Sequence, residues 1–90
     1  MLTKLSLLSN NIRDEGAAAI AEALQGNGVL KTLDLTGNAI RDEGAKALAS
    51  ALRVNGVLTK IVLWGNNLGD EGKGVIRDAV SGRVGFELNM

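Results

Sequence analysis

The sequence predicts an α/β solenoid in which short parallel strands line one side and α-helices line the other. A 28-residue pattern occurs three times without a gap, and each copy joins a stretch of two-residue hydrophobic period to a stretch of helical period. Copies 2–29 and 30–57 are identical at 17 of 28 positions. We therefore expect one domain over residues 1–90, with repeats 2–29, 30–57 and 58–80 and a terminal strand or cap at 81–90.

Each copy begins with a predicted strand and a tight turn. Apolar residues alternate with variable ones in the pairs Leu5 and Leu7, Leu33 and Leu35, and Ile61 and Leu63, as in strands with one buried face. An asparagine follows each pair at Asn10, Asn38 and Asn66, where its amide can satisfy backbone groups that the turn leaves unpaired. We expect these asparagines to be structural, and Ile12, Ile40 and Leu68 behind them to be core residues.

The second half of each copy predicts a helix. Ala17, Ile20, Ala21 and Leu24 follow the spacing of one apolar helical stripe, as do Ala45, Leu48, Ala49 and Leu52. Asp14, Asp42 and Asp70 stand at the expected helix starts, where each carboxylate is predicted to cap its own helix. Asn27-Gly28 and Asn55-Gly56 are predicted to end the helices with left-handed backbone dihedrals.

The third copy differs from the others on one helix flank. The small residues of the earlier helices are replaced by Lys73 and Arg77, which indicates a terminal capping repeat or, alternatively, drift on an exposed face. In the tail, we expect Phe86-x-Leu88 to form a short edge strand, with Phe86 in the place of Ile61.

These residues resemble a known family. The order Leu-x-x-Leu-x-Leu-x-x-Asn-x-Ile, followed by Asp-Glu-Gly-Ala and an Ala-rich helix, is similar to the long, helix-bearing leucine-rich repeat of ribonuclease-inhibitor-like proteins. Nucleotide-binding receptors and Ran GTPase-activating proteins share this repeat. The resemblance implies a parallel sheet on the concave side and helices on the convex side, with three repeats and a C-terminal edge strand. No residue can be matched to GTPase activation.

The first repeat lacks a charged helix flank like the one that Lys73 and Arg77 give the third copy. Leu2 is the first position of a repeat, so the first strand and helix have no preceding unit in this sequence. We expect either a longer array before it or another chain that covers this edge.

Composition excludes several functional classes. Ten Lys and Arg balance ten Asp and Glu, so we expect neither nucleic acid nor a membrane surface as partner. Without Cys or His the chain lacks the usual zinc ligands, thiolate nucleophiles and imidazole bases. The repeated carboxylates also lack the opposed pair that acid–base hydrolysis needs. We therefore predict no enzyme, catalytic residue, metal or cofactor, and an intracellular, cytoplasmic location.

The outward side chains of the strands are the predicted contact surface for another protein. They vary between copies while the framework does not, and Trp64 is the only Trp, a side chain favoured at interfaces. The alternative is that Trp64 only packs over its neighbouring turn. The candidate residues form three columns, namely Lys4, Thr32 and Lys60; Ser6, Asp34, Val62 and Glu87; and Leu8, Thr36 and Trp64.

The sequence is compatible with three functions. The first is a non-catalytic protein-interaction scaffold that uses this strand face. The second is a structural subunit of a larger or self-associating assembly that docks through the uncovered first repeat. The third is a GTPase-regulating module. Partner identity is not readable from the residues, because the fold serves unrelated functions.

Overall fold

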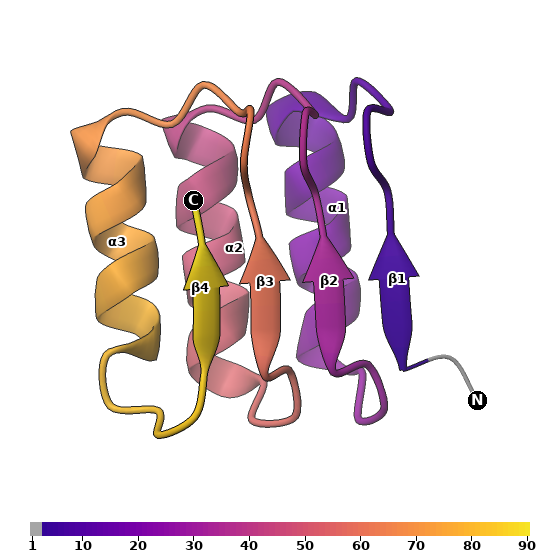
Figure 1. The fold of residues 1–90 in the computed structure, drawn as a ribbon, viewed down its shortest axis with the longest axis vertical. Coiled ribbons are helices and arrows are strands. Elements are labelled where there is room, and N and C mark those ends of the chain that lie inside the picture. Colours follow the sequence, from indigo (N-terminus) through magenta and orange to yellow (C-terminus); the bar gives the residue numbers. More distant parts are fainter. Residues whose placement is uncertain (1–2) are drawn as a thin grey trace.

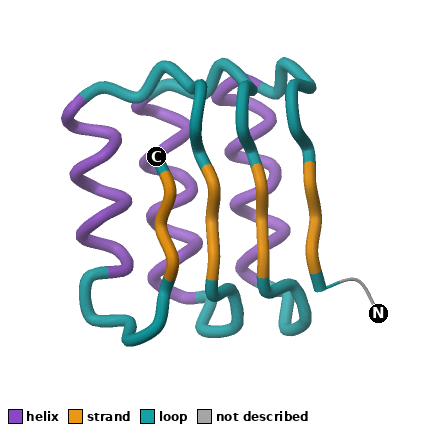
Figure 2. Tube along the Cα trace, in the orientation of Figure 1, coloured by secondary structure: helices purple, strands orange, loops and turns teal. Residues whose placement is uncertain are grey.

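One parallel sheet and a row of helices on one of its faces make up the molecule (Figure 1). The computed structural model describes residues 3–90. Over this range the elements alternate as predicted: β1 (Lys4–Ser6), α1 (Arg13–Gln25), β2 (Thr32–Asp34), α2 (Asp42–Val54), β3 (Lys60–Val62), α3 (Asp70–Val80) and β4 (Glu87–Asn89). Figure 2 shows the turns gathered at the two ends of this two-layer stack. The predicted α/β solenoid is confirmed; Leu2 lies outside the described residues.

Sheet order follows chain order, β1-β2-β3-β4, and every pair is parallel. Leu5 pairs with Leu33, and Leu33 pairs with Ile61, so the first two steps of the register equal the 28-residue sequence period. Among the described strands, β1 and β4 are therefore the two edges. The predicted edge position of the tail strand is confirmed.

The core fills the space between the sheet and the helices. Its largest side chains come from strands, helices and the segments that join them, and the most deeply buried are Leu33, Leu35, Ile40, Leu48, Leu52, Leu58, Ile61, Leu63 and Ile76. Small residues occupy the contacts between helices, including Ala17, Ala45 and Ala49. Each repeat buries its apolar faces against its neighbours, as solenoid stacking requires.

Asn10, Asn38 and Asn66 form the predicted structural series, here called the asparagine ladder, in which each is hydrogen-bonded to the next. The Asn38 side chain accepts a hydrogen bond from the backbone N–H of Asn10 at 2.7 Å and donates to the carbonyl oxygen of Leu7 at 2.8 Å. Asn66 repeats these contacts one unit later, with the N–H of Asn38 at 2.9 Å and the carbonyl of Leu35 at 2.9 Å. Each amide thus joins its own repeat to the preceding one.

The predicted helix caps were assigned to the wrong helices. Asp14 lies inside the first turn of α1, and its Oδ1 atom accepts hydrogen bonds from the backbone N–H groups of Arg41, at 2.7 Å, and Gly44, at 3.1 Å. Asp42 makes the equivalent contacts with Gly69 and Gly72 at the start of α3. Because these carboxylates project sideways from their own first turn, each one caps the next helix in the row. Asp70 makes no such bond within residues 3–90.

Glycine is required where these helix starts touch the preceding helix. A Cβ atom at Gly44 would lie 2.7 Å from Asp14 Oδ1 and 3.0 Å from the Cβ atom of Ala17. At Gly72 a Cβ atom would lie 3.2 Å from that of Ala45. The first turns of α2 and α3 therefore pack tightly against an alanine of the preceding helix.

The predicted left-handed helix ends are not observed. Positive φ angles occur instead in the turns after the strands, at Gly37 and Gly65 among others, while Asn55 has an extended backbone. The Asn55 side chain terminates α1 by donating to the carbonyls of Leu24 and Asn27, and it accepts from the N–H groups of Val57 and Leu58. Side-chain hydrogen bonding thus replaces the predicted backbone conformation.

Arg83 stands one period after Asn55 and takes over its role. Its guanidinium donates to the carbonyl oxygens of Leu52 and Leu58, and it lies 4.7 Å from the ring centroid of Phe86. Leu52 is the α2 counterpart of Leu24, so a side chain of the following repeat satisfies the same carbonyl at the end of both helices. The second carbonyl differs, because Asn55 binds Asn27 and Arg83 binds Leu58.

The predicted register of the last strand is wrong by two residues. Leu88, and not Phe86, pairs with Ile61, so the connection before β4 is one residue shorter than the earlier ones. Phe86 precedes the strand and packs against the core beside Arg83. Leu88 and Met90 match the alternation of Ile61 and Leu63, which was the sequence signal for the correct register.

The flank of α3 that carries Lys73 and Arg77 faces away from α2. The counterparts of Lys73 are Ala17 and Ala45, and those of Arg77 are Ala21 and Ala49. All four alanines are buried, whereas Lys73 is half-buried and Arg77 is exposed. No further helix packs there within residues 3–90. A role as terminal cap stays a prediction.

Candidate interaction surface

The sheet face opposite the helices brings the predicted contact residues together, with one change of membership. Lys4, Thr32 and Lys60 are neighbours across three strands, and Ser6, Asp34 and Val62 form the next column. Glu87 was predicted in this second column. Because the last strand has a different register, Glu87 instead pairs with Lys60, and Asn89 pairs with Val62.

This register creates an ion pair on the surface. Lys60 Nζ lies 3.3 Å from Glu87 Oε2, and Asn89 donates to the same oxygen at 3.2 Å. The hydrogen bond from Asn89, followed by the one from Lys60, holds the pKa of Glu87 below its ordinary value. Sequence reasoning missed Asn89 because it placed the strand two residues too early.

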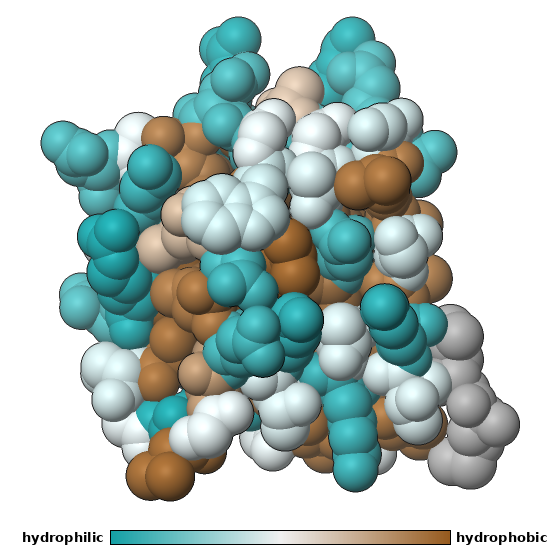
Figure 3. All heavy atoms as spheres, in the orientation of Figure 1, coloured by the Kyte–Doolittle hydropathy of each residue, from teal (hydrophilic) through white to brown (hydrophobic). Residues whose placement is uncertain are grey.

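The third column contains the largest exposed apolar side chains of this face. Trp64 is 53% exposed and Leu8 is 54% exposed, while Thr36 between them is half-buried. Across two strand spacings Leu8 and Trp64 are separated by about 10 Å, so they do not form one patch. The half-buried Val62 ends β3 and Trp64 lies in the turn directly after it, and these two residues are the local apolar spot. Figure 3 shows this face as mostly hydrophilic, with scattered hydrophobic side chains.

Asp34 is an ordered charge next to this spot. Its Oδ1 atom accepts hydrogen bonds from the hydroxyl of Thr36 at 2.6 Å and from the backbone N–H of Thr36 at 3.0 Å. These bonds, aided by the positive charges of Lys4 and Lys60, lower the pKa of Asp34 from its ordinary value of 3.8. The carboxylate is therefore ionised at neutral pH and points in a defined direction.

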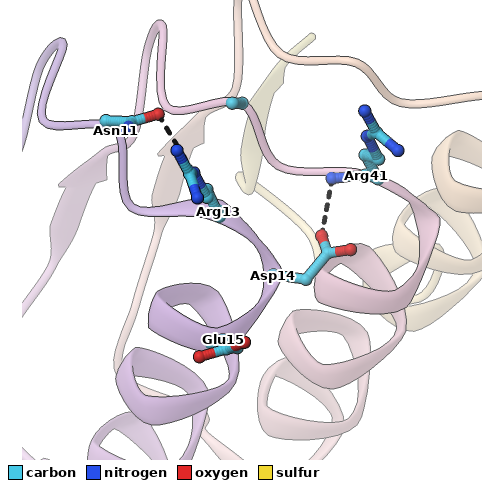
Figure 4. A pocket seen from close by; sticks show the side chains of 6 residues that line it. Asn11, Arg13, Asp14, Glu15 and Arg41 are labelled. Atoms are coloured by element: carbon cyan, nitrogen blue, oxygen red, sulfur yellow. Dashed lines mark hydrogen bonds between the residues drawn. The ribbon is translucent and has the colours of Figure 1, made fainter.

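A separate polar hollow lies at the turns between strands and helices. It has a volume of about 480 Å³ and is lined by Asn11, Arg13, Asp14, Glu15, Ala39 and Arg41. Figure 4 shows the Asp14 carboxylate directed at the Arg41 backbone, and Arg13 next to Asn11. The lining carries both signs of charge, and its best-ordered carboxylate already caps a helix. Its contacts are explained by the fold.

An apolar hollow lies between the sheet and α1, at the end of the stack formed by the first repeat. It has a volume of about 110 Å³ and is lined by Leu5, Ile20, Ala23, Leu24, Asn27, Leu30 and Leu33. In the described residues β1 is an edge of the sheet and α1 is at the end of the helix row (Figure 1).

Within residues 3–90, no three or more Asp, Glu, His or Cys side chains are grouped so that they could hold a metal ion. None of the helices in this range combines the length and apolar character needed to cross a membrane.

Comparisons with known proteins agree with this architecture. A family model described as Leucine Rich repeat matches residues 1–21 and 26–49. The solved structure of Leiomodin-1 actin-binding site 2 (ABS2) is similar, with a TM-score of 0.87 and 27% sequence identity over 96% of this chain. The match spans about half of that protein, 51% of its chain. No curated protein matches the sequence. The family and this neighbour support a role in protein interaction.

Proposed function

Because the chain belongs to the leucine-rich-repeat family, we propose that it is a non-catalytic protein-interaction module that binds its partner on the strand face. The observation that carries this proposal is the contrast between the two sides of the strands. Inward residues are the same or similar in every repeat, whereas the outward columns differ and end in the half-exposed Trp64. A rigid sheet that displays variable side chains is a suitable recognition surface.

Trp64 and Val62 are proposed as the energetic centre of this surface. Large side chains that become fully desolvated on binding dominate interface energies, and Trp is among the most effective. Lys60 and Asp34 flank them with ordered charges of opposite sign. We propose that the strand face acts as a unit within one domain of residues 1–90.

Monomeric actin is the first defined probe, because the similar solved structure is named as an actin-binding site. The experiment measures actin binding by the wild-type chain and by the double variant Trp64→Ala and Val62→Ala, using calorimetry. We expect the double variant to bind at least about tenfold more weakly. Val54→Ala is the matched control, since Val54 is 65% exposed at the end of α2 and away from the strand face. Equal loss in the control would contradict the assignment of the surface.

Failure of actin to bind would exclude actin and leave the surface to be tested directly. A photo-crosslinking residue at position 36, on the strand face, is then compared with one at position 50, exposed on α2. The proposal requires a protein crosslinked from position 36 and absent from position 50. Crosslinking from position 50 alone would move the interface to the helices.

The apolar hollow at the α1 end favours a second candidate, a structural subunit that docks through the first repeat. Leu5, Ile20 and Leu24 line this hollow, and burying it would remove apolar surface from water. Light scattering on the wild type and on Ala23→Glu tests the self-associating version, because Ala23 is exposed at the rim. A dimer that dissociates in the variant supports it, and a monomer in both contradicts it.

A further inference from the structure

The strand face presents one carboxylate oxygen that is ordered, charged and unused. Both hydrogen bonds to Asp34 involve Oδ1, so within residues 3–90 the Oδ2 atom has no hydrogen-bond partner. Thr36 holds the group rigidly, which reduces the entropy lost when a ligand binds to it. Asp34 is thus a pre-organised acceptor on an open surface.

The lysines around Asp34 do not occupy this acceptor. Lys60 is engaged by Glu87 at 3.3 Å, and neither Lys60 nor Lys4 lies within ion-pair distance of Asp34. Both lysines only attract the carboxylate at longer range. A cation from outside can therefore form the direct charge-assisted hydrogen bonds that the described residues leave unmade.

Trp64 stands diagonally across from Asp34, on the neighbouring repeat. Asp34 pairs with Val62, and Trp64 comes two residues later, in the turn after β3. The N–H groups of Leu35 and Gly37 donate to the carbonyls of Val62 and Trp64, so the pairing between the two repeats continues to Trp64. Strand spacing and rise place the Cα atoms of Asp34 and Trp64 about 8 Å apart. Half of the Trp64 side chain is open, and an indole face attracts cations. Val62 lies between the two and can cover the methylene stem of a long basic side chain.

We propose that Asp34, Val62 and Trp64 form a recognition site for an arginine side chain of the partner protein. This inference rests on the proposed binding function of the strand face and adds the chemistry of the contact. The guanidinium would stack on the indole and donate to Asp34 Oδ2, a combination that its planar, multi-donor geometry favours over a lysine ammonium. A glutamate side chain would instead face the Asp34 charge without a paired donor.

The test uses a defined probe and its neutral isostere. The full chain, labelled with ¹⁵N, is titrated with N-acetyl-arginine amide and with N-acetyl-citrulline amide at low salt, and its amide and indole N–H shifts are followed by NMR. We expect arginine to shift the Trp64 indole and the Asp34 and Thr36 amides, with citrulline about tenfold weaker because it lacks the charge. Equal shifts from both probes, or shifts located elsewhere, would overturn the proposal.

Two variants make the result specific. Asp34→Asn should weaken arginine binding by about tenfold while preserving side-chain shape, and Trp64→Leu should weaken it by several-fold. Asp78→Asn is the control, because Asp78 is exposed on α3, and this variant should bind the arginine probe like the wild type. Stronger binding of N-acetyl-glutamate amide to the wild type would reverse the assigned charge preference and overturn the proposal.

The outcomes also separate this inference from the proposed function. If arginine shows no selective binding but the Trp64 and Val62 double variant still loses its protein partner, only the assigned chemistry is wrong. If arginine binds as expected and that double variant keeps its partner, the site exists and the proposed interface does not.

Discussion

The first and second repeats have nearly the same sequence but different environments. They share 17 of 28 residues, yet Ile40 is fully buried while its counterpart Ile12 is half-exposed. Asn38 is likewise fully buried, and Asn10 is exposed. In the described residues the second repeat has a neighbour on each side, and the first has one on one side only. The burial of equivalent residues therefore depends on the position of their repeat in the stack.

The starts of their helices show the same difference in the backbone. Arg41 has an extended backbone, and its N–H group is held by the carboxylate of Asp14. Arg13 occupies the same place in the first repeat with a φ of 61°, and its N–H group bonds to the carbonyl of Asn38. Identical residues therefore adopt different dihedrals, depending on whether a preceding carboxylate is available.

The largest expected effect comes from the paired isoleucines. Ile40→Ala should lower the free energy of unfolding by about 4 kcal/mol, because it opens a cavity in a close-packed core. Ile12→Ala should cost about 1 kcal/mol, since its surroundings are half open. Urea denaturation of both variants measures the two values. Equal losses would show that the first repeat is as well packed as the second.

The paired asparagines should show the next largest difference. Asn38→Ala leaves the Leu7 carbonyl and the Asn10 N–H without their partner, and we expect a loss of about 2 kcal/mol. Asn10→Ala removes only an exposed bond to Leu8 and should cost less than about 0.5 kcal/mol. A thermal melt of each variant distinguishes them. A large loss from Asn10→Ala would mean that the ladder extends further than these contacts.

A smaller effect tests the capping between helices. Asp14→Ala should cost about 1 kcal/mol and speed amide hydrogen exchange at Arg41 and Gly44, which lie in the next repeat. Asp70→Ala is the matched control, because Asp70 accepts no hydrogen bond from the described residues. The free energy of unfolding of this variant should equal that of the wild type. Faster exchange confined to α1 would contradict capping of the following helix.

The smallest effect concerns the turn after each strand. Ser9 has a φ of 55° where Gly37 has 70°, so the first repeat places a residue with a Cβ atom in the left-handed region. Ser9→Gly should therefore stabilise the protein by up to about 1 kcal/mol. Gly37→Ala adds a Cβ atom at the equivalent position of the second repeat and should destabilise the protein. Denaturant midpoints measure the effect of each variant. A loss from Ser9→Gly would mean that the serine side chain contributes a contact worth more than the strain.

Repeat length, element order and the buried side of each strand were predictable, because they depend on a periodicity that three copies display. The direction of the Asp14 and Asp42 carboxylates was not, since a residue in a first helical turn can cap its own helix or an adjacent one. The predicted position of Glu87 was wrong because the register of the last strand was wrong. One residue is missing from the last connection, and only the alternation of Leu88 and Met90 reveals the shift.

The candidate surface was predictable as a set of outward positions but not as a set of interactions. Alternation placed Asp34, Val62 and Trp64 on the open face of the sheet. Alternation did not reveal that Thr36 would donate hydrogen bonds to only one carboxylate oxygen of Asp34. It also did not reveal the ion pair between Lys60 and Glu87. These contacts depend on cross-strand neighbours, which only the register determines.

The regular spacing of the junction contacts has a consequence for changing the size of the molecule. Asp14 and Asp42 each reach backbone groups 27 and 30 residues ahead, and Asn38 and Asn66 each reach groups 28 and 31 residues back. A tandem duplication of residues 30–57 would recreate every one of these bonds at the new boundary. Insertions of 27 or 29 residues would misalign all of them, so the stack can be lengthened in whole repeats.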